Sequence, residues 1–204
     1  MDSQNKTVFF RNFKFIINEH VYEPAEDSFL FAEKLDVNLG ERVLDMGTGC
    51  GILGILSSTT AKQIIGIDIN PYAVLCAKRN AELNNISSRI SFIQGDLFGP
   101  LKETELFDLI LFNAPYLPQN ERHSLAWIER AWAGGLDGRL VIDAFLSQVL
   151  GHLAFRGRIL LLQSTLSEVT KTLFYFKDHN LTAKIIAELH TTFFETIVLI
   201  EAMF

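Results

Sequence analysis

Short apolar runs alternate along the chain with longer segments whose apolar residues recur at helical spacing. Such alternation is typical of a parallel sheet that helices cover on both faces. The pattern therefore predicts an α/β fold with a doubly wound, mostly parallel sheet. The runs that predict strands lie at 43–46, 63–67, 90–93, 106–112, 159–163, 183–189 and 196–200.

Residues that favour element ends locate several helices. Asn70 and Pro71 supply an N-cap and a first-turn proline for a helix over 72–83. An apolar helix is expected from about Ile52, and another over 138–153 with Asp137 as its cap.

The first 40 residues have a pattern of their own. Two apolar runs at 8–10 and 13–17, broken at Arg11, predict a short hairpin. Pro24 and the acidic Glu26 and Asp27 then favour the start of a helix. Because the chain shows no linker or repeat, we expect one domain over 1–204, with the hairpin and helix of residues 1–40 packed on its core.

Composition limits the class of protein. The chain has 204 residues, 49% of them hydrophobic, and a formal net charge of −6. Negative charge argues against direct binding of nucleic acid, which normally needs a basic face. No apolar stretch is long enough to span a membrane, and the N-terminus does not resemble a signal peptide, so we expect a cytoplasmic protein.

Cysteine and histidine spacing predicts no metal site. Cys50 and Cys76 lack ligand spacing and are expected to be small buried thiols in a reducing compartment. The histidines are isolated from one another and predict surface or capped core roles. They are His20, His123, His152, His179 and His190.

A glycine-rich loop follows the first core strand. The loop runs Asp45-Met46-Gly47-Thr48-Gly49-Cys50-Gly51, and its glycines allow the backbone to pass close to a ligand at the next helix N-terminus. Gly49 also begins a Gly-x-Gly-x-x-Gly dinucleotide fingerprint, so spacing alone leaves a nicotinamide cofactor open, as well as a turn without ligand. Asp45 would repel a pyrophosphate but attract the cationic end of S-adenosylmethionine, which favours the methyl donor.

Two further acids end the next strands. Asp68, followed by Ile69, could accept both ribose hydroxyls, and Asp96, followed by Leu97, could bind the adenine amino group. Each acid could instead cap a helix or a turn. Acids at the ends of three successive strands nevertheless outline the crevice in which doubly wound sheets bind ligands.

The tetrapeptide Asn113-Ala114-Pro115-Tyr116 follows another buried strand. Pro115 restricts its own backbone and that of Ala114, so the carbonyls of Asn113 and Ala114 and the Tyr116 side chain are held in fixed directions. Such a turn suits the binding of a planar amide or amino group. An ordinary strand-ending turn is the alternative.

Taken together, these motifs resemble those of a known enzyme family. The chain resembles the class I S-adenosylmethionine-dependent methyltransferases, and within them the archaeal and eukaryotic form of the HemK-like branch, which methylates a glutamine amide of translation release factors. The resemblance implies a Rossmann-like, seven-stranded sheet with an antiparallel last strand. The matching stretches are 21–28, the glycine loop, 113–116, Trp132-Ala133-Gly134-Gly135 with Asp137-Gly138-Arg139, and Phe193-Phe194-Glu195-Thr196.

The resemblance also implies roles for residues. Asn113, Ala114, Pro115 and Tyr116 would hold the glutamine amide of a Gly-Gly-Gln loop, and Ser28 with its neighbours would close over S-adenosylmethionine. Ala114 departs from the family pattern, which has Pro there, but Ala supplies the same carbonyl. The runner-up functions are an adenine N6 or guanine N2 methyltransferase of nucleic acid, and a non-catalytic subunit with the same fold.

A protein partner is the last expectation. The run Ile90-Ser91-Phe92-Ile93 is expected to form an edge strand, and mean hydropathy is high at +0.21. Exposed edges are normally covered or blunted. The resemblance implies that a small zinc-binding activator adds a strand near Ser91 to Ile93, while a helix or loop of the chain itself could cover the edge instead.

Overall fold

The computed structural model of the protein describes residues 5–119, 126–191 and 194–204. His123 and Phe193, which entered the sequence argument, lie outside the described residues. The strands of the main sheet are β3 (Arg42–Met46), β4 (Gln63–Asp68), β5 (Ile90–Gln94), β6 (Phe107–Asn113), β7 (Leu153–Ser164), β8 (Thr182–His190) and β9 (Thr196–Met203).

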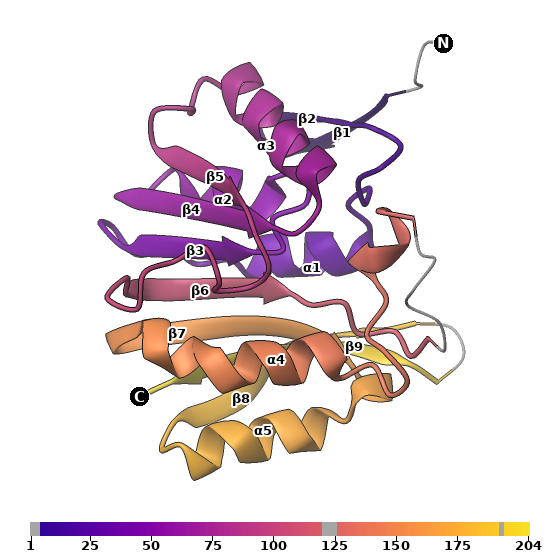
Figure 1. The fold of residues 1–204 in the computed structure, drawn as a ribbon, viewed down its shortest axis with the longest axis vertical. Coiled ribbons are helices and arrows are strands. Elements are labelled where there is room, and N and C mark those ends of the chain that lie inside the picture. Colours follow the sequence, from indigo (N-terminus) through magenta and orange to yellow (C-terminus); the bar gives the residue numbers. More distant parts are fainter. Residues whose placement is uncertain (1–4, 120–125, 192–193) are drawn as a thin grey trace.

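The sheet has the order β5-β4-β3-β6-β7-β9-β8 (Figure 1). Strands β3 to β7 pair in parallel, whereas β9 lies antiparallel to both β7 and β8. The chain runs outward from β3 to β5 and then returns to β6 on the other side of β3. This reversal makes a crevice at the carboxyl ends of β3 and β6. The predicted doubly wound, Rossmann-like sheet with an antiparallel last strand is confirmed.

Helices cover both faces of the sheet. Helices α1 (Glu26–Lys34), α2 (Ile52–Ser57) and α3 (Pro71–Leu83) pack on one face, and α4 (Leu140–Val149) and α5 (Val169–Asp178) pack on the other. Alternate residues of β6 supply the two cores, because neighbouring side chains on a strand point to opposite faces. Leu109 and Leu111 join the first core, and Ile110 and Phe112 join the second.

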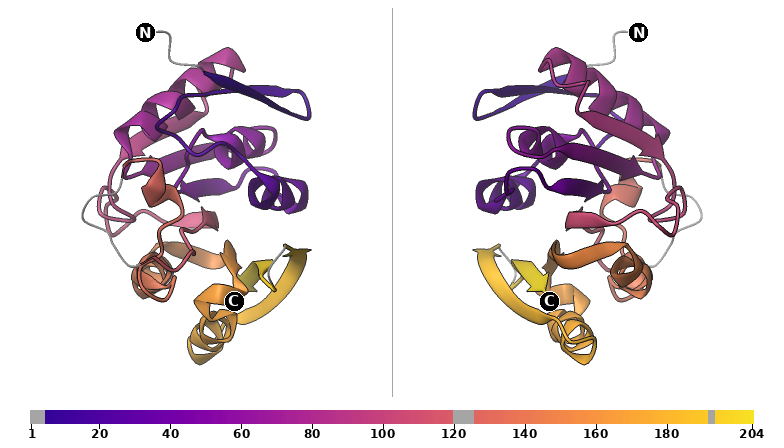
Figure 2. Two further views of the ribbon diagram at one scale, coloured as in Figure 1. Left: turned by 90° about the vertical axis from the view of Figure 1, so that its right-hand side faces the viewer. Right: turned by 90° about the vertical axis from the view of Figure 1, so that its left-hand side faces the viewer.

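The N-terminal hairpin is fastened to α3. Strands β1 (Lys6–Phe10) and β2 (Phe13–Ile17) pair antiparallel, as predicted, and lie with α3 toward the β5 edge of the sheet (Figure 1 and Figure 2). Asn80 on α3 and Asn84, its C-cap, accept hydrogen bonds from the backbone N–H groups of Ile16 and Lys14, at 2.9 and 3.0 Å. These side-chain amides thus bond backbone groups of β2 that a third strand would otherwise bond.

Helix ends match the sequence in part. The Asn70 side chain accepts a hydrogen bond from Tyr72 N at 2.9 Å and caps α3, as predicted. The predicted helix over 138–153 is present as α4 but is shorter, and the prediction that Asp137 caps it is wrong. Gly138 has a φ of +73°, which a helix does not allow, and Asp137 Oδ1 accepts from Arg139 N at 3.0 Å in a turn before α4.

The chain after α4 also departs from that prediction. A 3-10 turn, η2 (Leu150–His152), leads directly into β7, which is longer than the apolar run that predicted it. Helix α5 and the 3-10 turn before it, η3 (Thr165–Ser167), had no counterpart in the sequence analysis. Within the described ranges no helix is long and apolar enough to cross a membrane.

Candidate active site

A cavity of about 580 Å³ opens in the crevice at the carboxyl ends of β3 and β6. Its volume lies within the usual range for ligand pockets, about 300 to 1,000 Å³. Most residues that the sequence analysis assigned to the site line it. They are Ser28, Asp45, Gly47, Thr48, Gly49, Asp68, Ile69, Asp96, Leu97, Asn113, Ala114, Pro115 and Tyr116.

The glycine loop forms one wall of the cavity. Gly47 and Gly49 have φ values of +63° and +56°, which residues with a Cβ rarely adopt. Gly51, also expected at the cofactor, does not line the cavity. A Cβ there would lie 3.1 Å from Ala77 Cβ, so Gly51 instead allows the start of α2 to pack against α3.

Asp45 is buried behind this loop. Its Oδ2 accepts hydrogen bonds from Thr48 Oγ1 at 2.6 Å and from Gly54 N in the first turn of α2 at 2.9 Å. Burial raises the pKa of Asp45 to about 7, although both hydrogen bonds oppose that rise. Asp45 therefore holds the loop in place, and its second oxygen remains for a cation in the cavity.

Asp68 and Asp96 both line the cavity but differ in their exposure and hydrogen bonding. Asp68 accepts one backbone N–H on each oxygen, from Gly49 at 2.8 Å and from Asn70 at 2.9 Å. Burial raises the pKa of Asp68, against these two hydrogen bonds. A carboxylate has about four acceptor positions, so two remain for a ligand's hydroxyls. Asp96 is exposed at the rim of the cavity.

The side chain of Asn113 is fixed by a carboxylate that is distant in sequence. Asn113 Nδ2 donates to Asp27 Oδ2 at 3.1 Å and to Ser28 Oγ at 3.4 Å. A carboxylate only accepts hydrogen bonds, so the NH₂ group of Asn113 must face Asp27. The Asn113 side-chain oxygen is therefore available as an acceptor.

Asp27 organises further groups at the same wall. Its Oδ1 accepts from Tyr22 OH at 3.1 Å, Ser28 N at 2.6 Å and Ser28 Oγ at 3.1 Å. Burial and then the nearby Asp27 carboxylate raise the pKa of Tyr116, so its hydroxyl stays protonated. The ring of Tyr22 meets Trp132 edge to face, with 6.4 Å between ring centroids.

The tetrapeptide is attached to β7 and to the loop before α4. Ala114 N donates to Leu162 O at 3.3 Å, a bond that proline could not make. Farther on, Leu117 N donates to Trp132 O at 2.9 Å, and Gly134 N donates to Leu117 O at 2.8 Å. We name the end of the cavity that holds Asn113 and Tyr116 its acceptor end. Residues 132–138 thus form a backing layer behind this end.

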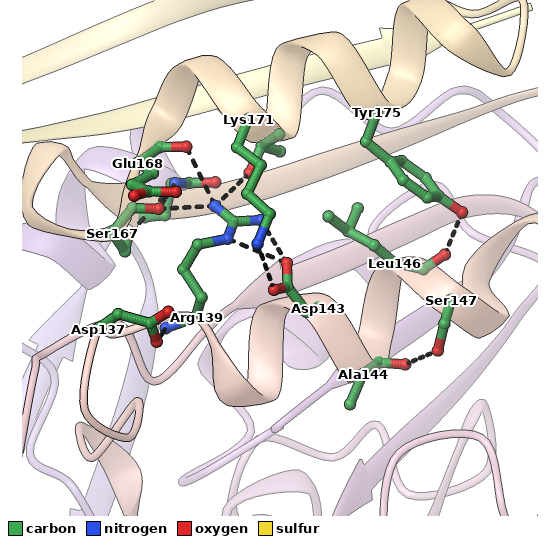
Figure 3. A network of polar contacts seen from close by, with 12 residues as sticks. Asp137, Arg139, Asp143, Ala144, Leu146, Ser147, Ser167, Glu168, Lys171 and Tyr175 are labelled. Carbon is green, nitrogen blue, oxygen red and sulfur yellow. Dashed lines mark hydrogen bonds and ion pairs between the residues drawn. The ribbon is translucent and has the colours of Figure 1, made fainter.

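A buried arginine secures this backing layer (Figure 3). The Arg139 side chain is 1% exposed and donates to Asp143 Oδ1 from Nε at 3.0 Å and from Nη2 at 2.6 Å. Its Nη1 donates to Ser167 O at 2.6 Å, Glu168 O at 3.1 Å and Thr172 Oγ1 at 3.1 Å. Arg139 therefore joins the start of α4 to η3 and to the start of α5.

The contacts between these elements were not predicted from the sequence. Asp27 and Tyr22 were expected only as residues of a matching stretch or of a helix start, and no chemical role was expected of Trp132 or Arg139. The acidic residue at 27 was visible, but its partner lies 86 residues away. No local spacing rule joins the two positions.

Comparison with known proteins identifies the family. Residues 23–131, more than half of the chain, match the family model described as "Methyltransferase small domain". A Methanocaldococcus jannaschii protein named "putative protein N5-glutamine methyltransferase" is 40% identical over 188 residues, which cover 91% of this chain and 93% of that protein. The chain belongs to the HemK-like class I methyltransferases. Human methyltransferase HEMK2 is 38% identical over 149 residues, covering 67% of this chain and 68% of its own.

Solved structures show the same methyltransferase fold. A chain of the Encephalitozoon cuniculi Mtq2–Trm112 complex, described as responsible for methylation of the termination factor eRF1, aligns with a TM-score of 0.66 at 21% identity, covering 90% of this chain and 98% of that chain. M. jannaschii TYW2, solved with S-adenosylmethionine, aligns with a TM-score of 0.69 at 15% identity, covering 99% and 86%. At these identities the likeness is one of fold.

Proposed function

We propose that this methyltransferase transfers the methyl group of S-adenosylmethionine to the side-chain amide nitrogen of the glutamine in the Gly-Gly-Gln motif of a translation release factor. The observation that carries the proposal is the fixed amide of Asn113, whose NH₂ group faces Asp27 and whose oxygen is left for a substrate N–H. Relatives named as glutamine methyltransferases support the same acceptor.

The residues of the cavity fit the methyl donor. Asp68 has acceptor positions for two ribose hydroxyls, exposed Asp96 can accept from the adenine amino group, and Asp45 offers an oxygen to the cationic amino acid end. S-adenosylmethionine supplies an electrophilic methyl group on a positively charged sulfur. Three acids at one cavity suit that positive charge and would repel a pyrophosphate, which argues against a nicotinamide dinucleotide.

The acceptor end must make a weak nucleophile reactive. The lone pair of an amide nitrogen is delocalised, so orientation and charge stabilisation have to supply the rate. The Asn113 oxygen and the Ala114 carbonyl would accept the two N–H groups of the substrate, aim its lone pair at the methyl carbon, and stabilise positive charge that develops on nitrogen. Tyr116 would cover the planar amide. The new N–C bond forms as the S–C bond breaks, and the nitrogen then releases a proton to water.

The first 40 residues belong to the same catalytic unit in this proposal. Helix α1 supplies Asp27 and Ser28 to the cavity, and without them Asn113 would lose its fixed orientation. The proposed substrate also places the protein where translation occurs, in the cytoplasm.

A small activator is the proposed partner, and the open edge of β5 is its site. The solved Mtq2–Trm112 complex supports a partner of this kind. We further propose that the activator of this protein binds zinc. Beside β5, the carbonyl of Arg89 accepts from Ile64 N of β4, and Gly95 N donates to Asp68 O of β4, so these two groups point toward β4. Because such groups alternate along a strand, the N–H of Gln94 faces the open edge.

Phe92, in the predicted edge strand, is unsuitable for testing this partner. It is 7% exposed, and Gly66 leaves room for its ring, since a Cβ there would lie 2.6 Å from Phe92 Cδ1. Gln94→Pro is the better variant, because it removes an outward N–H and edge strands tolerate proline. We expect it to abolish the solubility and activity gained by co-expression with the activator, while Gln94→Ala keeps both gains. Equal gains in the two variants would contradict this site.

Transfer from labelled S-adenosylmethionine tests the proposed function. We expect label on a release factor from the same source organism, and none on tRNA or DNA at equal concentration. Label on nucleic acid alone would favour a nucleic-acid methyltransferase. Cofactor binding without transfer to any of them would favour a non-catalytic subunit.

A further inference from the structure

Four large apolar side chains are exposed beside the acceptor end of the cavity. Leu136 is 76% exposed, Leu140 47%, Leu166 49% and Phe194 105%. They lie in the loop before α4 and its first residue, in η3, and in the turn between β8 and β9. We name these four residues the apolar rim. Single exposed apolar side chains are ordinary, whereas a group on adjoining segments marks an interaction surface.

Hydrogen bonds and close approaches show that the three segments adjoin. Arg139 Nη1 donates to Ser167 O at 2.6 Å, and a Cβ on Gly138 would lie 3.1 Å from Ser167 Cβ. Thr196 N donates to Thr165 Oγ1 at 3.0 Å, which joins the start of β9 to η3. The buried Arg139 side chain therefore holds two of these segments together before any partner binds (Figure 3).

The apolar rim is continuous with the cavity. Val141, which follows Leu140, lines the cavity, and a Cβ on Gly138 would lie 2.3 Å from the carbonyl oxygen of Tyr116. The starts of α4 and α5 lie at the same end of the sheet as the carboxyl ends of β3 and β6 (Figure 1). A molecule whose amide reaches Asn113 from outside would pass beside these residues.

The proposed substrate needs such a surface. A Gly-Gly-Gln segment offers one side chain and two residues without any, so the cavity can bury little of it. Specific protein complexes bury roughly 1,200 to 2,000 Å² in total. Most of the affinity for a protein substrate must therefore come from contacts outside the cavity.

We propose that the apolar rim is the surface on which the body of the protein substrate docks while its glutamine enters the cavity. This inference rests on the proposed function for the identity of the substrate. Its partner is a folded protein that presents an apolar patch next to a flexible glycine-containing loop. Because Arg139 preorganises the rim, docking needs little ordering of the enzyme.

The test compares full-length release factor with a short Gly-Gly-Gln peptide. The variant combines Leu136→Ser and Leu166→Ser, two exposed positions where the fold does not need leucine. Leu39→Ser is the matched control, because Leu39 is 90% exposed and precedes β3 at the opposite end of the sheet. The dissociation constant of the factor, measured by calorimetry, should rise by about tenfold or more in the double variant. kcat/KM for the peptide should stay at the parent value, and Leu39→Ser should change neither quantity.

Three results would overturn the docking surface. They are an unchanged dissociation constant in the double variant, an equal loss for factor and peptide, and a parent dimer that the variant converts to monomers in sedimentation. Binding of the factor that weakens in the variant, without methylation by either protein, would support the docking surface and contradict the proposed reaction.

Discussion

The Asp27 carboxylate determines which end of the Asn113 amide faces the substrate. In Asp27→Asn, residue 27 can donate as well as accept, so the Asn113 amide is free to turn over. A hydrogen bond to a charged group contributes about 1.5 to 3 kcal/mol, which corresponds to a fall in kcat of roughly 10- to 100-fold. Steady-state kinetics and calorimetry should show this loss of kcat with little change in cofactor affinity.

Tyr22→Phe is the matched control for that variant. It removes a hydrogen bond to Asp27 Oδ1 but leaves the bond between Oδ2 and Asn113. We expect a much smaller loss of kcat. Equal losses in the two variants would mean that Asp27 acts on general packing and not on the orientation of Asn113.

Ala114 replaces a family proline, and its backbone N–H restrains the loop instead. The bond from Ala114 N to Leu162 O continues the ladder between β6 and β7. Ala114→Pro removes this donor and leaves a buried acceptor, which costs about 1 to 3 kcal/mol, while proline returns less than about 1 kcal/mol by stiffening the unfolded chain. Denaturant unfolding should show a less stable variant. A more stable variant would show that the bond contributes nothing.

The charge of Asp45 opposes folding because the carboxylate is buried. Its folded pKa of about 7 lies above the ordinary value of 3.8, so its contribution to stability is full below pH 3.8 and is lost as the pH rises through 7. Asn keeps an oxygen for Thr48 and Gly54. Asp45→Asn should therefore be more stable than the parent at pH 8 and nearly equal at pH 4, and it should bind S-adenosylmethionine more weakly at pH 8. Thermal unfolding at both pH values, with calorimetry, measures these effects, and a less stable variant at pH 8 would contradict them.

At the residue scale, sequence predicted the groups that lie next to one another in a motif. The glycine loop and the tetrapeptide could be found because their spacing is local. The function of Asp27 could not, since the carboxylate reaches Asn113 only after α1 packs beside the carboxyl end of β6. Gly51 packs against α3 and does not line the cavity, and spacing does not tell whether a glycine faces a ligand or a neighbouring helix.

Among the elements, the contact between α4 and α5 depends most on one side chain. Asp143 is 42% exposed, so its ion pair with Arg139 contributes little, but Arg139→Met also leaves the buried Ser167 carbonyl and Thr172 hydroxyl without their donor. An unpaired buried polar group costs about 1 to 3 kcal/mol, so the variant should be destabilised by at least that amount, and the loop that backs Tyr116 should loosen. Lys171→Met is the control, because Lys171 also pairs with Asp143, at 2.8 Å, but is 53% exposed, so its loss should cost less than about 1 kcal/mol. Equal costs in denaturant unfolding would contradict this account of Arg139.

Element prediction succeeded where burial and periodicity agree. The strands of the sheet core and α3, with its Asn70 cap, carry clear signals. Helix α5 has Val169, Leu173 and Phe176 at helical spacing, but its threonines and aromatic residues also favour strands, so its type was not evident from the sequence. The predicted helix over 138–153 is too long at both ends, because the left-handed Gly138 delays its start and the 3-10 turn η2 replaces its last turn before β7.

The whole molecule is a sheet whose reversal point lies between β3 and β6, and the sequence predicted that architecture from alternating strands and helices. The position of the cavity follows from the topology. The two partner surfaces follow less directly. An open strand edge can be anticipated from sheet order, whereas the apolar rim collects residues from 136 to 194 that only the folded chain brings together.

The most direct test of the central claim is to locate the transferred methyl group on the product. Release factor treated with the enzyme and S-adenosylmethionine is digested and sequenced by tandem mass spectrometry. The methyl group should lie on the side-chain amide of the Gly-Gly-Gln glutamine, and it should be absent with Asn113→Ala, a variant that still binds the cofactor. A methyl group on another residue, or methylation of that glutamine at the parent rate by Asn113→Ala, would contradict the account.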